Sequence, residues 1–274
     1  MSDISKYLRA SMLPHIWCPG CGHGIVTGAV MRAIDRAGLC QDKTVIVSGI
    51  GCSSRAPGYM DFDTLHTTHG RALAYATGVK LANPELNVVV ITGDGDMAAI
   101  GGNHFIHACR RNIGICTVCF NNSTYGMTGG QYSPLTPKAS YASTAPYGNI
   151  DRSFDICDLA KAAGATYVAR ATTYHIALLI NLITKALQKK GFSLVEAVSQ
   201  CPTYFGRRNR LGAGAKMMEW YRDNSVTREA YSRLGPEQRA QKIVIGEFHN
   251  VDEPEYTDEY AKVVEIAQKR REAR

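Results

Sequence analysis

The chain has 274 residues, a length that can bury a full α/β core as one domain or as a domain with an appendage. Hydrophobic residues make up 45% of the sequence, which includes 26 Gly and two Trp, and this composition excludes a disordered or fibrous protein. The formal net charge of +7 would suit binding to nucleic acid, but no nucleic-acid motif accompanies the basic residues, and we expect no such partner.

The first nine residues, MSDISKYLR, are polar and lack the apolar core of a signal peptide. No stretch of the sequence approaches the roughly 20 apolar residues that a membrane span needs. We therefore expect a cytoplasmic protein with no membrane partner.

The cysteine content is high. Nine Cys in a chain without a secretion signal favour metal or redox chemistry over structural disulfides. Cys18-Pro19-Gly20-Cys21 could be half of a zinc knuckle, a thioredoxin-like pair or two cluster ligands, although no strand precedes it, which disfavours the redox pair. A second such spacing, at residues 116–119, lies inside a predicted strand and lacks a chelating turn. Five cysteines are therefore expected in the core: Cys40, Cys109, Cys116, Cys119 and Cys157.

Apolar runs bounded by Gly and Asn alternate with helical patterns between residues 23 and 198. The runs predict strands at residues 44–48, 87–92, 114–120, 166–169 and 193–198. The helical patterns lie at about 23–38, 70–83, 99–112, 155–164 and 174–190. This alternation predicts an α/β fold with a doubly wound, mostly parallel sheet and right-handed crossovers. Ligands of such sheets bind beyond the carboxyl ends of the strands.

Glycine-rich or polar segments follow four of these strands, at residues 49–55, 93–96, 121–131 and 199–202, and we expect them to converge on one edge. Asp94 lies between two glycines after one strand, and Asn122, 28 residues later, follows the next strand. One βαβ crossover spans that separation, and oxygen ligands from a carboxylate and an amide suit Mg²⁺. Gly-Asp-Gly alone is also a common turn, but the paired Asn favours a magnesium diphosphate site.

The strand and helix alternation stops near residue 206, and the remainder predicts an extended C-terminal arm with short helices near 214–223 and 256–271. We divide the chain into a domain at residues 1–205 and an extension at residues 206–274, which we expect to pack on a partner subunit. Part of the positive charge forms two groups in this extension, at Arg207, Arg208, Arg210 and Lys216 and at Lys269, Arg270, Arg271 and Arg274. We interpret it first as a solvated basic face and second as a docking surface for an acidic protein.

Gly-Asp-Gly followed by Asn-Asn resembles the thiamine-diphosphate signature of transketolase-like enzymes. By this resemblance, Asp94, the side chain of Asn122 and the backbone carbonyl of Thr124 hold the Mg²⁺ that anchors the diphosphate. The chain then has a thiamine diphosphate-binding fold of the diphosphate type.

Two further segments narrow the resemblance. Residues 125–131, YGMTGGQ, and residues 66–71, HTTHGR, are similar to segments of 2-oxoacid:ferredoxin oxidoreductase β subunits. His69 would then lie near the cofactor phosphates, whereas by itself it would be a helix N-terminal residue without a ligand. The resemblance implies these cofactor contacts: Ile50, Gly51, Cys52, Ser53, His69, Gly93, Asp94, Gly95, Asp96, Asn122, Thr124, Tyr125, Gly126, Met127 and Thr128.

The same resemblance implies one [4Fe–4S] cluster. The family has Cys-x-x-Cys-Gly near its N-terminus, Gly-Cys after the first strand and Cys-Pro after the last, and this chain has all three. The implied ligands are Cys18, Cys21, Cys52 and Cys201. The loop at residues 50–53 would then contact both the thiamine and the cluster, so that electrons leave the cofactor one at a time.

The activity implied is the oxidative decarboxylation of a 2-oxoacid to an acyl-coenzyme A, with electrons passed to ferredoxin. The resemblance covers about residues 10–210 and corresponds to the diphosphate-binding half alone. An α subunit carrying the catalytic Glu is therefore implied, and the β chain by itself should be inactive.

Substrate choice depends on Arg55, which could pair with a distal carboxylate, and on Met127, which could line the acyl pocket. Arg55 could equally form a surface salt bridge. Residues 201–209, CPTYFGRRN, look most like the 2-oxoglutarate branch, while pyruvate, branched-chain 2-oxoacids and indolepyruvate remain alternatives. The more distant alternatives are a non-redox thiamine decarboxylase or synthase subunit and a zinc-stabilised scaffold.

Overall fold

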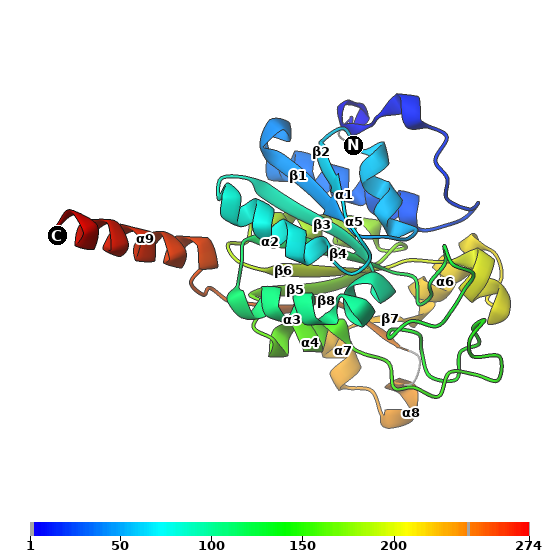
Figure 1. Ribbon diagram of the computed structural model, residues 1–274. Coiled ribbons are helices and arrows are strands. Elements are labelled where there is room, and N and C mark those ends of the chain that lie inside the picture. The colour runs from blue at the N-terminus through cyan, green and yellow to red at the C-terminus, as the bar shows by residue number, and fades with distance from the viewer. Residues whose placement is uncertain (1–2, 240–241, 274) are drawn as a thin grey trace.

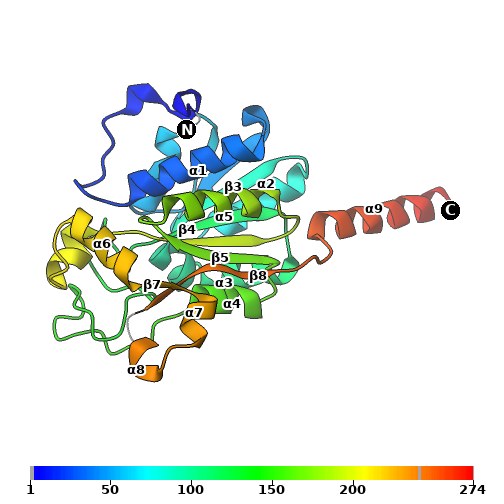
Figure 2. The same ribbon diagram turned by 180° about the vertical axis from the view of Figure 1, so that it is seen from behind.

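The computed structural model describes residues 3–239 and 242–273 and contains an eight-stranded sheet with helices on both faces (Figures 1 and 2). The strand order is β2-β1-β3-β4-β6-β5-β8-β7. The first six of these strands are mutually parallel, and β8 runs antiparallel to β5. This architecture confirms the predicted doubly wound, mostly parallel sheet.

The strands are β1 (Thr44–Ser48), β2 (Asp63–His66), β3 (Asn87–Gly93), β4 (Ile115–Asn121), β5 (Tyr167–Thr172), β6 (Ser193–Val198), β7 (Ser225–Thr227) and β8 (Ile243–Asn250). The α-helices are α1 (His23–Ala37), α2 (Ala72–Ala82), α3 (Gly102–Arg111), α4 (Ile156–Ala162), α5 (Ile176–Gln188), α6 (Gly214–Asn224), α7 (Arg228–Ser232), α8 (Pro236–Arg239) and α9 (Tyr256–Glu272). Short helical turns are η1 (Ser5–Tyr7), η2 (Ala10–Met12), η3 (Gln41–Lys43), η4 (Ser53–Tyr59), η5 (Asp96–Ile100) and η6 (Pro202–Gly206).

Two apolar layers enclose the sheet. Helices α1 and α5 pack on the face that includes Val89 and Ile91 of β3 (Figure 2), and helices α2, α3 and α4 pack on the face that includes Val88 and Val90 (Figure 1). The central strands are buried on both faces, which explains why they appear in the sequence as continuous apolar runs. All five predicted strands exist, and those at residues 44–48 and 193–198 have the predicted bounds.

Three strands were not predicted. β2 has the sequence DTLH, and three of its four residues are exposed at the sheet edge, so no apolar run marks it. β8 and β7 come from the predicted arm, and β8 extends the sheet beyond β5. β8 is half-buried and contains Gly246, whose φ is +117°. The two predicted helices of the arm correspond to α6 and α9, while the domain division at residue 206 stays a prediction.

Helix α9 starts at the amino ends of the parallel strands and projects away from the body (Figure 1). Its N-cap, Glu255, is buried and accepts a 2.6 Å hydrogen bond from the backbone N–H of Gly114, just before β4. Glu255 also accepts a bond from the N–H of Thr257 at 2.7 Å, so one carboxylate fixes the helix start to the sheet. No helix in the described residues is both long and apolar enough to cross a bilayer.

The burial of the cysteines agrees with the prediction at four of five positions. Cys109, Cys116, Cys119 and Cys157 are buried in the core. The prediction for Cys40 was wrong, because Cys40 is exposed. It lies in the surface connection between α1 and β1, where no neighbouring element covers it.

Candidate active site

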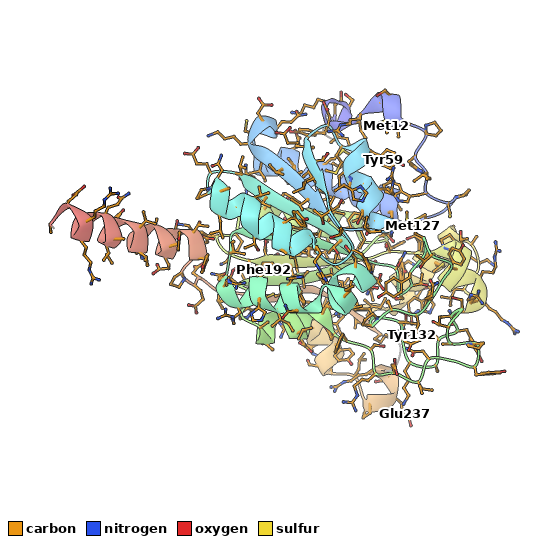
Figure 3. The ribbon with its side chains drawn as sticks, viewed as in Figure 1. Met12, Tyr59, Met127, Tyr132, Phe192 and Glu237 are labelled. Atoms are coloured by element: carbon orange, nitrogen blue, oxygen red, sulfur yellow. The ribbon has the colours of Figure 1, made fainter. Side chains whose placement is uncertain are left out.

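The carboxyl ends of β1, β3 and β4 surround a cavity of about 250 Å³. Its lining contains every residue predicted to contact the cofactor, from residues 50–53, 93–96 and 124–128 together with His69 and Asn122. His23 and Phe120 also line it and were not predicted, although His23 directly follows Cys21-Gly22. Figure 3 marks Met127 at this end of the sheet and Phe192, which precedes β6, near the opposite end.

Three oxygen atoms converge in this cavity. The side-chain Oδ1 of Asn122 lies 3.2 Å from Oδ1 of Asp94 and 2.7 Å from the backbone oxygen of Thr124. In this orientation the amide oxygen faces two other oxygens, whereas the rotated amide would donate a hydrogen bond to each of them. An octahedral Mg²⁺ with bonds of about 2.05 Å holds neighbouring ligand oxygens about 2.9 Å apart. The two distances bracket that value, so the residues present fit a Mg²⁺ ion.

Ser133 holds the other carboxylate oxygen of Asp94. Its hydroxyl donates a short hydrogen bond to Oδ2, and both side chains are buried. Burial raises the pKa of Asp94 to about 7, and the bond from Ser133 opposes this increase. Sequence reasoning missed Ser133 because it lies 39 residues from Asp94 in a long loop without a motif.

Asp96 is turned toward the loops and not toward the three oxygens. Its carboxylate accepts hydrogen bonds from the N–H of Gly70 at 2.6 Å, the hydroxyl of Thr92 at 2.8 Å and the N–H of Ile50 at 3.3 Å. Nδ1 of His69 lies 2.7 Å from the same carboxylate. Asp96 thus connects the loops after β1 and β2 to the end of β3, and its carboxylate lies beside His69 at the cavity wall.

A second buried carboxylate supports the Asn-Asn turn from behind. Glu196 of β6 accepts hydrogen bonds from Nδ2 of Asn121 at 2.7 Å and from Nε of Arg170 at 2.5 Å. Oδ1 of Asn121 accepts a 3.0 Å bond from the N–H of Ser123, whose φ of 58° is unusual for a residue other than glycine. Glu196 therefore helps to fix the turn that carries the Asn122 and Thr124 oxygens.

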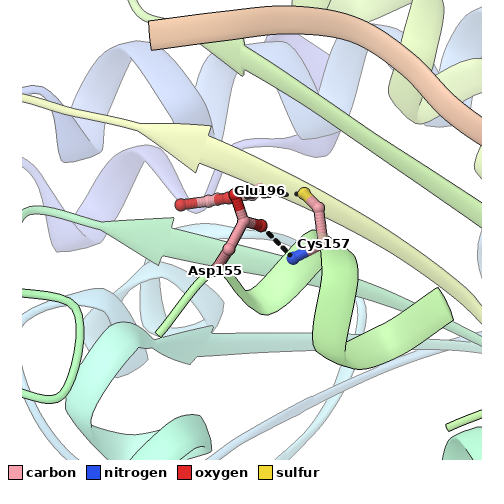
Figure 4. A group of neighbouring side chains, drawn as sticks. All are labelled: Asp155, Cys157 and Glu196. Atoms are coloured by element: carbon pink, nitrogen blue, oxygen red, sulfur yellow. Dashed lines mark hydrogen bonds between the residues drawn. The ribbon is translucent and has the colours of Figure 1, made fainter. Parts of the chain in front are cut away.

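Glu196 also has two neighbours from the start of α4, Asp155 and Cys157 (Figure 4). Ligand atoms of these three residues lie within 4.8 Å of one another, close enough for a metal ion. However, Arg170 contacts both carboxylates, at 2.8 Å to Asp155 and 2.5 Å to Glu196. We interpret the group as a buried ion network in which the guanidinium supplies the positive charge.

The four predicted cluster cysteines lie close together, because neighbouring thiols contribute to the raised pKa values of Cys21, Cys52 and Cys201. Burial raises the pKa of Cys21 to about 12, and the thiols of Cys201, Cys52 and Cys18 add smaller increases. Burial likewise raises the pKa of Cys52 to about 11, with further contributions from Cys201, Cys18 and the carboxylate of Asp94. The thiol group therefore adjoins the three-oxygen site.

The spacing of these cysteines does not match a single zinc ion. Tetrahedral zinc with bonds of about 2.3 Å places its sulfurs about 3.8 Å apart. Within the described residues, no three of the four thiols lie within 4.8 Å of one another. Burial raises the pKa of Cys201, and hydrogen bonds from the backbone N–H groups of Phe205 and Tyr204 oppose that increase. Such N–H groups at a sulfur suit an anionic thiolate.

The two residues predicted to face the substrate differ in position. Met127 lines the cavity and is 49% exposed. Arg55, in η4, is half-buried and does not line the cavity. Its Nε is buried without a hydrogen-bond partner, and it forms no ion pair in the described part of the chain. The salt bridge considered for Arg55 is therefore not seen.

Comparisons with known proteins agree with this geometry. The family model "Thiamine pyrophosphate enzyme, C-terminal TPP binding domain" matches residues 49–197. The sequence is 54% identical over 260 residues to 2-oxoglutarate synthase subunit KorB of Methanothermobacter marburgensis. The aligned region covers 95% of this chain and 91% of that protein. It is 53% identical over 265 residues to the protein of the same name from Methanocaldococcus jannaschii, with 97% and 98% covered.

One solved structure is also similar, that of 2-oxoglutarate:ferredoxin oxidoreductase from Magnetococcus marinus with 2-oxoglutarate, coenzyme A and succinyl-CoA bound. The TM-score is 0.86 at 34% identity, and the match covers 97% of this chain and 91% of that chain. The similarity therefore extends from the cavity loops to almost the whole fold.

Proposed function

Because this chain belongs to the 2-oxoacid:ferredoxin oxidoreductase β subunits, in their 2-oxoglutarate branch, we propose that with an α subunit it decarboxylates 2-oxoglutarate oxidatively onto coenzyme A. The observation that carries the proposal is the adjacency of two sites. The converging oxygens of Asp94, Asn122 and Thr124 lie beside four thiols, and Asp94 itself perturbs Cys52.

In this proposal Asp94, Asn122 and the Thr124 carbonyl bind Mg²⁺, and diphosphate oxygens complete the octahedron. The buried Asp94 carboxylate supports this assignment, because a buried negative charge needs a cation or a proton beside it. Ser133 donates its hydrogen bond to Oδ2 of that carboxylate, while Oδ1 faces Asn122.

Thiamine diphosphate supplies the carbon nucleophile and the electron sink for decarboxylating a 2-oxoacid. This chain positions it and limits its contact with water. Gly95 lets the ring of Tyr125 lie against the backbone, where a Cβ would stand 2.2 Å from the ring, and the Tyr125 hydroxyl donates a 3.2 Å bond to the Gly95 carbonyl. Ile50, Phe120 and Met127 give the cavity an apolar wall.

Cys18, Cys21, Cys52 and Cys201 would hold one [4Fe–4S] cluster. Cys52 lines the cavity, and its backbone carbonyl accepts a 2.7 Å bond from Nε1 of Trp17, close to the first two cysteines. A loop shared by both sites supports a short path for single electrons to leave the cofactor.

We assign the distal carboxylate of the substrate to Arg55, whose half-buried guanidinium has no ion partner in the described residues. The M. marinus enzyme with 2-oxoglutarate, coenzyme A and succinyl-CoA bound supports the same substrates for this chain. Pyruvate and branched-chain 2-oxoacids lack the distal carboxylate and would leave this charge unpaired.

The expected protein partners are the α subunit and ferredoxin. Helix α9 is suited to hold a partner subunit, because it projects from the sheet and exposes Tyr260, Val263 and Ile266 by 53%, 58% and 52%. These residues share one side of the helix at i, i+3 and i+6.

The proposal is tested with the co-purified complex, by viologen reduction with coenzyme A and each of several 2-oxoacids. We expect iron with broad absorbance near 400 nm, a requirement for thiamine diphosphate and Mg²⁺, and the highest kcat/KM with 2-oxoglutarate. An iron-free complex that decarboxylates without reducing viologen would instead identify a non-redox thiamine enzyme. Stoichiometric zinc with little iron would identify a scaffold.

A further inference from the structure

Four exposed cations follow the last cluster cysteine: Arg207, Arg208, Arg210 and Lys216, here called the basic rim. Within the described residues, none of them forms an ion pair or a side-chain hydrogen bond. Residues 202–218 contain no Asp or Glu. The basic rim is therefore a local excess of positive charge.

The basic rim lies next to the cysteine group. Arg207 and Arg208 directly follow η6, whose backbone N–H groups face Cys201. Lys216 is in the first turn of α6, and the start of that helix packs on the Cys18–Cys21 turn, since a Cβ on Gly214 would stand 2.5 Å from the Gly20 carbonyl.

One of the four thiols is open to the outside. Cys18 is exposed, whereas Cys201 is buried and Cys21 and Cys52 are half-buried. The outer side of the cysteine group is thus the side at which another protein could receive electrons. The unpaired cations lie in the segments that adjoin it.

We propose that the basic rim is the docking surface of an acidic one-electron carrier protein that collects electrons from the cluster; this rests on the proposed function. Charge complementarity supports the choice of partner, because unpaired exposed cations steer an acidic protein to this face. Each oxidised carrier takes up one electron, so two carriers serve each 2-oxoacid that loses two electrons. A carrier that docks here does not need to reach the cavity.

The test compares two acceptors in the intact complex. Arg207→Glu/Arg208→Glu should lower kcat/KM for an acidic ferredoxin roughly tenfold at low ionic strength, because steering changes association rates by 10-fold or more. The deficit should shrink at about 0.5 M salt, where exposed charges are screened. The viologen rate with 2-oxoglutarate and coenzyme A, and the iron content, should stay within about twofold of the unaltered complex, since a small dye needs no docking surface.

The chain offers a matched control. Arg110→Glu/Arg111→Glu makes the same change of charge on two exposed residues in the last turn of α3, just before β4 begins at the opposite edge of the sheet. It should leave ferredoxin kinetics unchanged. Arg207→Lys/Arg208→Lys keeps the charge and should behave like the unaltered complex.

Unchanged ferredoxin kinetics in the charge-reversed complex, with viologen reduction intact, would overturn the basic rim as a docking surface. If that variant loses iron, Arg210→Glu/Lys216→Glu provides a second charge reversal. Its ferredoxin kinetics and its viologen reduction then support or overturn the proposal in the same way. An unaltered complex that reduces no viologen would refute the proposed function itself, so the two failures are distinguishable.

Discussion

Replacing Asp94 with Asn keeps the shape of the side chain and removes the only carboxylate among the three converging oxygens. Without a cation, burial raises the pKa of Asp94 from 3.8 to about 7. A difference of about three units corresponds to roughly 4 kcal/mol at 25 °C. Because the folded pKa is raised, the folded protein binds more protons than the unfolded chain between about pH 4 and pH 7.

The sign of the effect follows from this proton excess. The stability of the metal-free chain should fall as pH rises through this window and level off above about pH 7. Asn carries no charge at any of these pH values, so the variant lacks this loss. At pH 8 in EDTA it should be more stable than the unaltered chain by up to about 4 kcal/mol, and at pH 4 the two should be nearly equal.

Urea unfolding in EDTA at pH 4 and pH 8 measures this difference. Adding Mg²⁺ and thiamine diphosphate should reverse the order at pH 8, because only the unaltered chain has the charged ligand. We expect a loss in Mg²⁺-thiamine diphosphate affinity of more than about 100-fold, beyond the 10- to 100-fold typical of residues that only support a ligand. A variant no more stable in EDTA at pH 8 would refute the burial argument, and unchanged cofactor affinity would refute the metal site.

Three other predictions concern the supporting residues. Glu196→Gln should destabilise the chain by about 3–5 kcal/mol in urea unfolding, because the buried guanidinium of Arg170 loses a charged partner; a change below about 1 kcal/mol would contradict the ion network. Cys201→Ser should lower the iron content of the complex, and full retention of iron would remove Cys201 from the cluster ligands. Arg55→Met should raise KM for 2-oxoglutarate at least about tenfold and leave KM for pyruvate nearly unchanged, as the loss of a charge-assisted hydrogen bond requires. Equal effects on both substrates would remove Arg55 from the carboxylate site.

Much of the site could be predicted because a parallel sheet converts sequence position into spatial position. Asp94 and Asn122 each follow a strand that is buried on both faces, so local apolar runs were enough to place both at one edge. Ser133 and Glu196 could not be found in this way. Their partners are distant in sequence, and a single buried Ser or Glu has no pattern that distinguishes it from other core polar residues.

The same reasoning explains the missed elements of the fold. β2 and β8 lie toward the two sides of the sheet and are only partly covered, so their side chains do not form the apolar runs that mark central strands. Cys40 was assigned to the core by residue type alone, but type does not determine burial in a turn between a helix and a strand.

The reversed direction of β8 has a consequence for assembly. A strand parallel to β5 would deliver the chain to the carboxyl edge, but β8 returns it to the amino edge, where Glu255 fixes the start of α9. A subunit bound stably at α9 and a carrier protein bound transiently near Cys18 would then lie at opposite ends of the molecule. The carrier could dissociate after each electron transfer without weakening the contact between the subunits.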